Sequence, residues 1–337
     1  MSRRRIFSRR SDASRFRLPI GLLLVVLAVG VCVLIPVNQI DITTVNVSNP
    51  DLPTALPTQT PLPLPTKPNI GRIIFTCTRG DFNQLCWVNA DGTRYQQLTN
   101  VEAHNYYPVY SPRGGSIVYA SNQNGGAFDL FLFIFDGAKL IRLTDFIGNV
   151  ISPSFSPDGK RILFANRAGV GPTSLWMVDN NGENASLLYT GADTIVAADW
   201  SPDGITIAFA MAVNNPNEYQ IFLMGADGSN VRQLTHNLAG IGGSLDWSPD
   251  GKYLLIYAGP DGDKDIFRID VAAQTATQLT DGGNNAASSY SPDGQWIAFN
   301  SLRNNDQADI FIMRADGTDM RQVTTDPEPD WQPQWEP

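Results

Sequence analysis

The stretch WSPDGITIAFAM at residues 200–211 decides the fold, because close copies of it recur along the chain. The turn Ser-Pro-Asp-Gly, or in the first case Ser-Pro-Arg-Gly, begins at Ser111, Ser156, Ser201, Ser248 and Ser291. Consecutive copies lie 45, 45, 47 and 43 residues apart. Proline presets φ at the second turn position and glycine accepts a positive φ at the fourth. Each copy therefore predicts a tight turn between two strands.

The residues around each turn complete a repeating unit. An aromatic residue precedes every turn: Tyr110, Phe155, Trp200, Trp247 and Tyr290. An apolar run follows, such as SIVYAS at 116–121, then a third run such as DIFRID at 265–270, and finally a short segment ending in Leu-Thr or Val-Thr. Runs rich in β-branched and aromatic residues predict strands. Four strands in about 45 residues match one blade of a β-propeller.

The two ends of the repeat region predict one shared blade. Residues 67–77, KPNIGRIIFTC, resemble a degenerate turn and a second strand with no first strand before them. Residues 331–337, WQPQWEP, resemble a first strand with no blade after it. Residues 70–337 divide into six units of about 45 residues. We therefore expect an all-β fold, a six-bladed β-propeller closed by the terminal strands, which leaves no open sheet edge.

The N-terminal region predicts a membrane anchor. No charged residue occurs between Arg17 and Asp41, and residues 18–40 are long and apolar enough to cross a bilayer as one transmembrane helix. Residues 1–17 contain seven arginines, which predicts a cytoplasmic tail. A cleaved signal peptide is the alternative, but residues 35–38 offer no small-residue cleavage site. We expect an uncleaved signal anchor in the cell membrane, with the propeller on the periplasmic or extracellular side.

A linker is predicted between the anchor and the propeller. Within residues 41–69, the stretch 49–69 holds seven prolines and four threonines. Such a segment favours extended polyproline II conformation and acts as a spacer. The expected organisation is a basic tail at 1–17, an anchor at 18–40, a Pro/Thr-rich linker at 41–69 and the propeller at 70–337.

The net charge and the cysteines limit which partners and which cellular compartment are expected. Residues 18–337 carry 17 basic and 32 acidic groups, so the folded part should repel phosphates and we expect no nucleic-acid partner. Cys77 and Cys86 flank a predicted hairpin loop. Exported thiols oxidise, so one interpretation is a disulfide between them, and two buried free thiols are the alternative.

The repeats resemble the WD40-like propeller repeat of the TolB family, which is also found in prolyl oligopeptidases. The resemblance rests on the five aromatic-Ser-Pro turns, the strands after them, the Leu-Thr ends, and the Ala-Asp-Gly turns at Ala90, Ala226 and Ala315. It implies an extracytoplasmic propeller that binds proteins or small ligands. An anchor and a linker stand where TolB has an α/β domain, so a role in the Tol–Pal system does not carry over.

Catalytic and metal-binding signals are weak. The only histidines are His104 and His236, and neither a G-x-S-x-G elbow nor a P-loop occurs. The run from Asp261 to Asp265 has the D-x-D-x-D spacing of a calcium loop, but it lacks the glycine at position six and the glutamate at position twelve. We expect no cofactor, with calcium at this loop as a weak alternative.

The loops that lead into the innermost strands predict a ligand site at the channel mouth. Their amide, carboxylate and imidazole groups suit polar or cationic ligands: His104, Asn105, Asn149, Asp193, Asn284, Asn285 and Asp330. Capping of the loops is the alternative role. The predicted function is a membrane-anchored, non-catalytic binding module for an exterior protein, peptide or glycan. The alternative is a hydrolase or lyase, with or without a metal, that acts on an extracellular glycan or peptide.

Overall fold

The computed structural model describes residues 71–337 except 192, 214, 305 and 306. All described residues belong to one compact unit. The predicted cytoplasmic tail, transmembrane anchor and linker lie outside the described residues and stay predictions. Within the described part, no helix is both long and apolar enough to cross a membrane.

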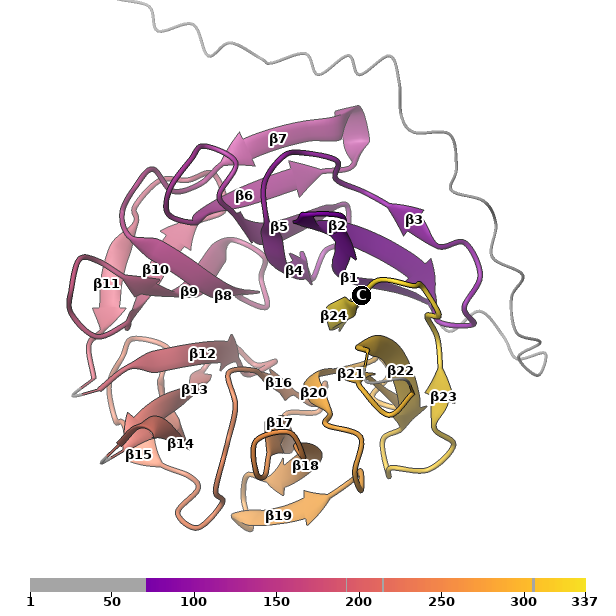
Figure 1. Ribbon diagram of the computed structural model, residues 1–337. Helices are drawn as coiled ribbons and strands as arrows, with labels where there is room; N and C mark the ends of the chain where they lie inside the picture. The colour runs from indigo at the N-terminus through magenta and orange to yellow at the C-terminus, as the bar shows by residue number, and fades with distance from the viewer. Residues whose placement is uncertain (1–70, 192, 214, 305–306) are drawn as a thin grey trace, which may run out of the picture. The chain divides into compact units, whose positions relative to one another are not determined.

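Six four-stranded antiparallel sheets surround a central axis, which confirms the six-bladed propeller (Figure 1). One short 3-10 helix, η1 (Asp136–Ala138), interrupts the second blade. From the innermost strand outward, the blades are as follows. Blade 1 is β24 (Asp330–Trp335), β1 (Arg72–Arg79), β2 (Phe82–Asn89) and β3 (Gln96–Gln97); blade 2 is β4 (Asn105–Tyr110), β5 (Ser116–Ser121), β6 (Asp129–Ile134) and β7 (Lys139–Arg142); blade 3 is β8 (Asn149–Phe155), β9 (Arg161–Arg167), β10 (Ser174–Asp179) and β11 (Ser186–Tyr189). Blade 4 is β12 (Ile195–Trp200), β13 (Thr206–Val213), β14 (Asn215–Gly225) and β15 (Arg232–Gln233); blade 5 is β16 (Leu245–Trp247), β17 (Tyr253–Ala258), β18 (Asp265–Asp270) and β19 (Thr275–Gln278); blade 6 is β20 (Ala286–Tyr290), β21 (Trp296–Ser301), β22 (Asp309–Arg314) and β23 (Arg321–Gln322).

The Ser-Pro-Asp-Gly segments form the predicted turns between the first and second strands. In blade 4, the Ser201 hydroxyl donates to Asp203 Oδ1 at 2.5 Å and accepts from the Thr206 amide at 2.9 Å. Gly204 has a φ of 71°, which favours glycine. The serine and the aspartate therefore hold the turn closed, and the same pattern recurs at Ser156, Ser248 and Ser291.

The Leu-Thr ends anchor the outer strand in several blades. In blade 5, the Thr280 hydroxyl donates to Asp265 Oδ1 at 2.8 Å and accepts from the Ile266 amide at 2.9 Å. Thr144 makes the same pair of bonds with Asp129 and with the Leu130 amide in blade 2. A threonine hydroxyl is both donor and acceptor, so it satisfies a buried side chain and a backbone amide together. This requirement explains why the repeat ends in threonine.

Strand β24 closes the ring by pairing antiparallel with β1, as the sequence predicted. Ile73 lies opposite Trp335 and Cys77 lies opposite Asp330. At the far end of the pair, the Arg72 side chain forms an ion pair with Glu336, and the Glu336 amide donates to the Arg72 carbonyl at 2.8 Å. The first blade is therefore built from opposite ends of the described chain.

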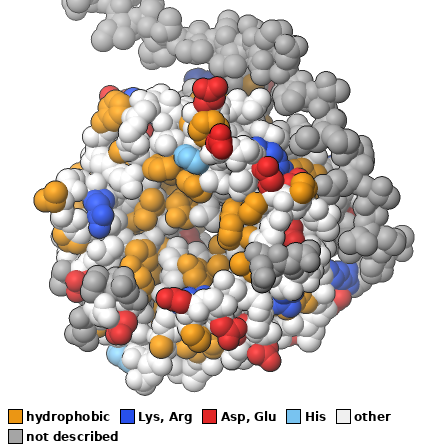
Figure 2. Space-filling model, viewed as in Figure 1, with side chains coloured by type: hydrophobic (Ala, Val, Ile, Leu, Met, Phe, Trp, Pro, Cys, Tyr) orange, Lys and Arg blue, Asp and Glu red, His pale blue; other side chains and the backbone are white. Residues whose placement is uncertain are grey.

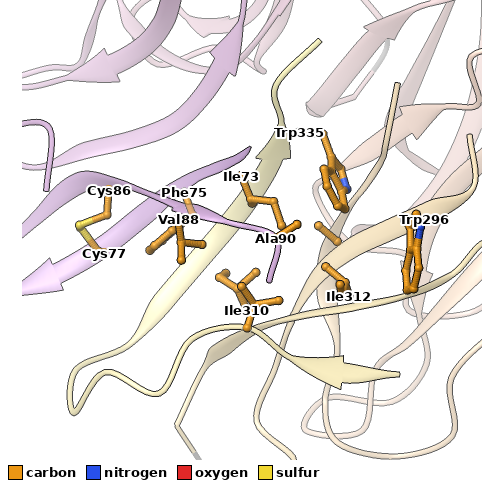
Figure 3. Packing of buried hydrophobic residues seen from close by; sticks show 12 residues of the cluster. Ile73, Phe75, Cys77, Cys86, Val88, Ala90, Trp296, Ile310, Ile312 and Trp335 are labelled. Atoms are coloured by element: carbon orange, nitrogen blue, oxygen red, sulfur yellow. A yellow bond between two sulfur atoms is a disulfide. The ribbon is translucent and has the colours of Figure 1, made fainter. Parts of the chain in front are cut away.

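The seam between blades 1 and 6 is packed with apolar side chains (Figure 3). Ile73, Phe75 and Val88 are fully buried and belong to one cluster with side chains of β21, β22 and β24. Trp335 contributes from β24 with only 4% of its surface exposed. The closing strand is thus held by hydrophobic burial as well as by the backbone ladder.

The structure contains a disulfide between Cys77 and Cys86, which the sequence left open. The two residues are diagonal neighbours in the β1–β2 hairpin, because Cys77 lies opposite Gln84 and Cys86 lies opposite Phe75. Their Cα atoms are 5.8 Å apart, and both side chains are fully buried. The disulfide therefore joins the strand that receives β24 to its outer neighbour.

Replacing Trp335 with alanine should lower the free energy of unfolding by about 3–5 kcal/mol, because a large side chain is removed from the packed seam. Urea unfolding followed by circular dichroism measures the change. Leu187→Ala is the matched control, since that leucine is 52% exposed and its removal should change stability by no more than about 0.5 kcal/mol. An equal loss of unfolding free energy in both variants would contradict the conclusion that packing at the seam stabilises the closed ring.

Candidate functional site

The six innermost strands enclose a central channel cavity of about 310 Å³. On the face shown in Figure 2, hydrophobic side chains gather around the central hollow. The cavity is lined by residues of all six blades: Tyr107, Pro108, Val109, Ile151, Ser152, Pro153, Ser154, Val196, Ala197, Ala198, Asp199, Gly243, Ser244, Leu245, Asp246, Tyr257, Ala287, Ser288, Gln332, Pro333 and Gln334. We take this cavity as the candidate site.

One repeat position differs in chemistry from blade to blade around the channel. It is the residue just before the aromatic that precedes each turn, and in blades 1 to 6 it is Gln334, Val109, Ser154, Asp199, Asp246 and Ser289. Since neighbours along a strand point to opposite faces, this residue points to the channel side when the aromatic packs between blades. Five of the six line the cavity. Only blades 4 and 5 place a carboxylate there.

Asp199 lies deep in the channel wall but keeps some contact with the cavity. The Ser154 hydroxyl donates to Asp199 Oδ1 at 2.5 Å from blade 3, and the Trp247 amide donates to Oδ2 at 3.2 Å from blade 5. Burial raises the pKa of Asp199 to about 6, because few polar groups replace the lost water. This carboxylate therefore bridges three blades and titrates within an accessible pH range.

Asp246 occupies the equivalent place in the next blade. Its Oδ2 accepts from the Tyr290 amide at 2.8 Å, and its Oδ1 lies 3.4 Å from Gln334 Nε2. Burial, together with the negative charge of Asp199, holds the pKa of Asp246 well above its usual range. The charge of Asp199 therefore adds to burial in disfavouring the ionised form of Asp246.

Four innermost strands are bulged at the same repeat position near the channel mouth. Tyr107, Ser152, Ala287 and Gln332 have φ values between 49° and 56°, and the strand register shifts at each. Bulges re-aim side chains and are common beside functional sites. Gln332 Oε1 accepts from the Tyr107 amide at 3.0 Å and from the Thr76 hydroxyl at 2.9 Å. The bulge in β24 thus also joins the first blade to the second.

A row of half-buried rings leads from the β1–β2 hairpin to the channel mouth. Neighbouring ring centroids are 5.6 Å apart for Phe82 and His104, 5.9 Å for His104 and Tyr106, and 5.6 Å for Tyr106 and Phe128. Tyr107, which lines the cavity, lies 6.1 Å from Tyr106. Asn83 Nδ2 donates to the Tyr106 hydroxyl at 2.6 Å and fixes this ring. We call Phe82, His104, Tyr106 and Phe128 the aromatic row.

The seven sequence-predicted site residues lie at or near the starts of innermost strands, and none of them lines the cavity. His104 lies in the aromatic row. Asn149 is exposed and accepts from the Phe128 amide at 3.1 Å, while Asn284 accepts from the Lys264 amide at 3.3 Å. Asp193 is half-buried in the loop before β12. Ligand binding by these residues stays a prediction.

Asn105, Asn285 and Asp330 are fully buried and serve as links between blades. Asn285 Nδ2 donates to the Thr280 hydroxyl at 3.0 Å and lies 3.2 Å from Asp265 Oδ1, so it joins β20 to the Leu-Thr network of blade 5. Asn105 Nδ2 lies 3.3 Å from Gln84 Oε1. For these three residues, the hydrogen bonds support the alternative role, which is to cap the loops and hold them in place.

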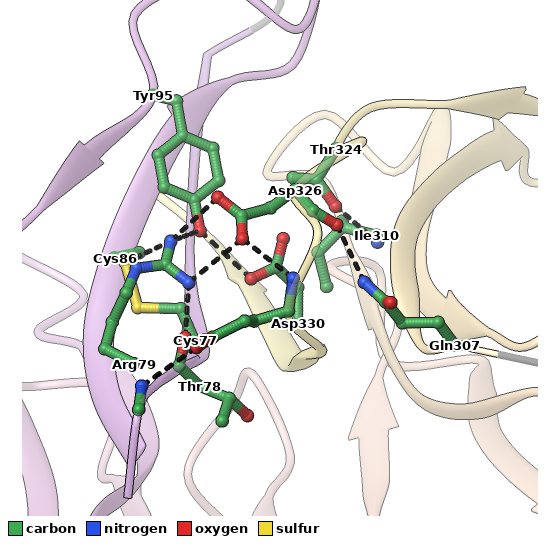
Figure 4. A network of polar contacts seen from close by, with 12 residues as sticks. Cys77, Thr78, Arg79, Cys86, Tyr95, Gln307, Ile310, Thr324, Asp326 and Asp330 are labelled. Carbon is green, nitrogen blue, oxygen red and sulfur yellow. Dashed lines mark hydrogen bonds and ion pairs between the residues drawn. A yellow bond between two sulfur atoms is a disulfide. The ribbon is translucent and has the colours of Figure 1, made fainter. Parts of the chain in front are cut away.

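Asp330 belongs to a polar network at the seam (Figure 4). Its Oδ1 accepts from the Tyr95 hydroxyl at 3.0 Å, and Arg79 contacts both Tyr95 and Asp326, with Nη2 3.2 Å from Asp326 Oδ2. Burial raises the pKa of Asp330 well above its usual range and also raises that of Tyr95. This network, close to the disulfide, fixes the start of β24.

The predicted calcium loop is organised around a lysine. Lys264 Nζ donates to the carbonyls of Gly240 at 3.0 Å and Gly259 at 2.6 Å, and it pairs with Asp261 at 3.0 Å. Asp265 is engaged by Thr280 and Gln278. Within residues 71–337, leaving out the four gaps, no group of three His, Cys, Asp or Glu side chains could hold a metal. Calcium at this loop stays a prediction.

Sequence reasoning missed Asp199, Asp246 and the serines of the channel wall. The signal was present in the repeat, because Asp199 and Asp246 precede Trp200 and Trp247 while other blades carry serine, valine or glutamine there. Alternation along the strand would have pointed this position to the channel side, opposite to the aromatic. The bulges, which decide the register before it, are not visible in the sequence.

Comparison with known proteins supports the repeat assignment. The sequence profile described as the TolB beta propeller domain matches residues 165–337. A stretch of 114 residues is 38% identical to an uncharacterised protein of Agrobacterium fabrum, covering 34% of this chain and 38% of that protein. A stretch of 89 residues is 33% identical to the Tol-Pal system protein TolB of Anaeromyxobacter dehalogenans, covering 26% of this chain and 20% of that protein. The chain thus spans well under half the length of these relatives.

Solved structures share the fold. TolB from Acinetobacter baumannii superposes with a TM-score of 0.70 at 22% identity, covering 79% of this chain and 67% of that one. A chain of a nidogen–laminin complex superposes with a TM-score of 0.64 at 11% identity, covering 78% of this chain and 98% of that one. At these identities the likeness concerns the propeller fold alone.

Replacing Asp199 with asparagine should flatten the pH dependence of stability between pH 4 and 6. In the wild type, the folded state holds this proton more tightly than the unfolded state, whose pKa is near 3.8. The free energy of unfolding therefore falls as the pH rises from 3.8 through about 6. Urea titrations at several pH values measure the slope.

The control for this prediction is Asp203→Asn, which alters an exposed turn carboxylate. Hydrogen bonding from Ser201 lowers the pKa of Asp203, so its titration contributes below the tested range. The control should keep the wild-type slope between pH 4 and 6. An Asp199→Asn variant that keeps the same slope would show that this buried carboxylate does not titrate as described.

Proposed function

Because the chain belongs to the TolB β-propeller family, we propose that it is a non-catalytic binding module, with the channel mouth holding an extended segment of a partner protein. The observation that carries the proposal is the channel cavity of about 310 Å³, open beside the aromatic row. Ligand sites are concave, largely apolar and supplied with a few convergent polar groups. The cavity has this composition, with tyrosine, proline and valine beside two carboxylates.

The aromatic row supplies an apolar track for the partner segment. Its rings are half-buried, so each offers an accessible surface while its position is fixed by packing. Aromatic side chains that are already ordered bind at a low cost in conformational entropy, and they dominate the energetics of many interfaces. Proline and aromatic side chains of an extended segment are suited to such rings. A protein or peptide partner is therefore favoured over a glycan.

The location of this module is proposed to be outside the cytoplasm, tethered to the cell membrane. The support is the apolar segment 18–40 with the seven arginines before it, the Pro/Thr-rich segment 41–69, and the buried disulfide between Cys77 and Cys86. Alkaline phosphatase fused after residue 337 should be active in intact cells. Activity only after cell lysis would overturn the proposed orientation.

Tyr106→Ala should weaken the binding of peptides at the channel mouth by about tenfold or more, the loss typical of a central aromatic contact. The probe is a phage-displayed library of random peptides selected on the full chain. The affinities of the selected peptides are then measured by fluorescence anisotropy. Tyr253→Ala is the matched control, because Tyr253 is also a half-buried tyrosine but begins β17, next to a Ser-Pro turn.

Two outcomes would overturn the proposed peptide site. Selected peptides that bind both variants equally would place their contacts away from the aromatic row. A library that yields no peptide bound at the channel mouth would also overturn the proposed site. Turnover of a glycan or peptide by the purified chain would instead favour the hydrolase or lyase alternative.

A further inference from the structure

The channel holds two carboxylates without a cation of this chain beside them. No Lys, Arg or His occurs among the residues that line the cavity, as far as the structure describes the chain. Asp199 and Asp246 are held by a serine hydroxyl, a glutamine amide and backbone amides. Carboxylates away from bulk water are normally paired with a positive charge. The described lining of the channel therefore supplies no positive charge for either carboxylate.

Two hydroxyls in the same wall also lack partners. Ser244 Oγ and Ser288 Oγ are buried and have no hydrogen-bond partner among the described residues. Ser288 is only 5% exposed, and both serines line the cavity that Asp199 and Asp246 line. Unsatisfied buried hydroxyls are uncommon in native proteins and each costs free energy. They are an observation independent of the carboxylates, and they point to a guest that offers hydrogen bonds.

We infer that the channel receives a cationic side chain of the partner segment, the guanidinium of arginine or the ammonium of lysine, between Asp199 and Asp246. This inference rests on the proposed function and names the chemistry of its guest. The carboxylates accept the charged hydrogen bonds, and the serine hydroxyls accept further N–H groups. A guanidinium, with five N–H donors, matches a wall of scattered oxygen acceptors better than a single point charge does.

The geometry of the strands fits the length of such a side chain. The carboxylate position lies two residues beyond the position that is bulged in four of the six innermost strands, a distance of about 7 Å. An extended arginine side chain has a comparable length, so a backbone at the mouth can deliver its guanidinium to this depth. Tyr107 of blade 2 and Tyr257 of blade 5 line the cavity and flank the path as uncharged rings, since burial raises the pKa of both.

An organic cation fits this site better than a metal ion bound by the protein alone. The described residues offer no group of three His, Cys, Asp or Glu side chains for a metal, whereas a guanidinium needs only one or two carboxylates. A cavity of about 310 Å³ also exceeds the volume of a single bare ion. The guest that fills the space and neutralises the charge is therefore a side chain carried by a larger partner.

Replacing the two carboxylates tests the inference on the full chain. The probes are N-acetyl-arginine amide, its citrulline counterpart, which has the same shape without the charge, and calcium chloride. Binding is measured by NMR titration of the backbone amides of Trp247 and Tyr290, which donate to the two carboxylates. The arginine probe should bind at least tenfold more tightly than the citrulline probe. An Asp199→Asn, Asp246→Asn double variant should remove this preference.

The control variants separate the inference from folding defects. Asp203→Asn, an exposed turn carboxylate, should leave the preference for arginine unchanged. Asp246→Ser introduces the residue that blade 6 carries at this position, Ser289, and should weaken the arginine probe with the fold intact. Equal binding of arginine and citrulline, or no saturable binding of arginine below about 10 mM, would overturn the inference. Displacement of the arginine probe by micromolar calcium would assign the channel to the metal instead and would also overturn it.

Failure of this inference is distinguishable from failure of the proposed function. One outcome is a library peptide that loses affinity with Tyr106→Ala but binds equally well when its arginine is replaced by citrulline. This outcome would support the peptide site and overturn the inference of a bound cation. The opposite outcome is a peptide that needs its arginine and binds the Tyr106→Ala variant as tightly as the wild type. This outcome would overturn the role of the aromatic row and support the bound cation. The two results together therefore show whether the aromatic row, the carboxylates or both contact the peptide.

Discussion

The pairing of β24 with β1 is the constraint on which the rest of the molecule depends. These strands come from opposite ends of the described chain, and their hydrogen bonds turn an open row of sheets into a ring. Without the ring there is no channel, because the cavity is bounded by one strand from every blade. Gln332 shows the dependence directly, since its side chain bonds to Thr76 in β1 and to the Tyr107 amide in β4. Closure and the geometry of the mouth are therefore set by the same residue.

The repeats divide into positions that build the blade and positions that line the channel. The Ser-Pro-Asp-Gly turns and the Leu-Thr networks recur with nearly the same hydrogen bonds from blade to blade. The position before each aromatic varies, and its polar members meet in the channel wall. Local rules that a sequence obeys everywhere specify the fold, and the places where repeats depart from one another are candidates for function. Asp199 and Asp246 are such departures.

The fold was predictable from the sequence because its determinants are local and repeated. Turn residues, strand composition and the two half-blades at the ends were sufficient to predict six blades and the closing strand, and they placed Cys77 and Cys86 on one hairpin. The site was harder, because it depends on how six strands face one another. Asn105, Asn285 and Asp330 are polar and were expected in loops at the mouth, yet they lie at or just before the first residue of an innermost strand, and burial makes them links between blades. Bulges at Tyr107 and Ser152 shift the register and bring residues further along each strand to the channel.

The closing strand also places a demand on synthesis of the protein. Thr76 and its hydrogen-bond partner Gln332 are 256 residues apart in sequence. At ordinary translation speeds, the ribosome takes roughly 13 to 50 s to cover that distance. For that interval, β1 exists as an unpaired sheet edge beside an incomplete seam, which is the kind of surface that aggregates. The ring therefore cannot close until residues 330–335 are available, and a chaperone that covers strand edges would suit that interval.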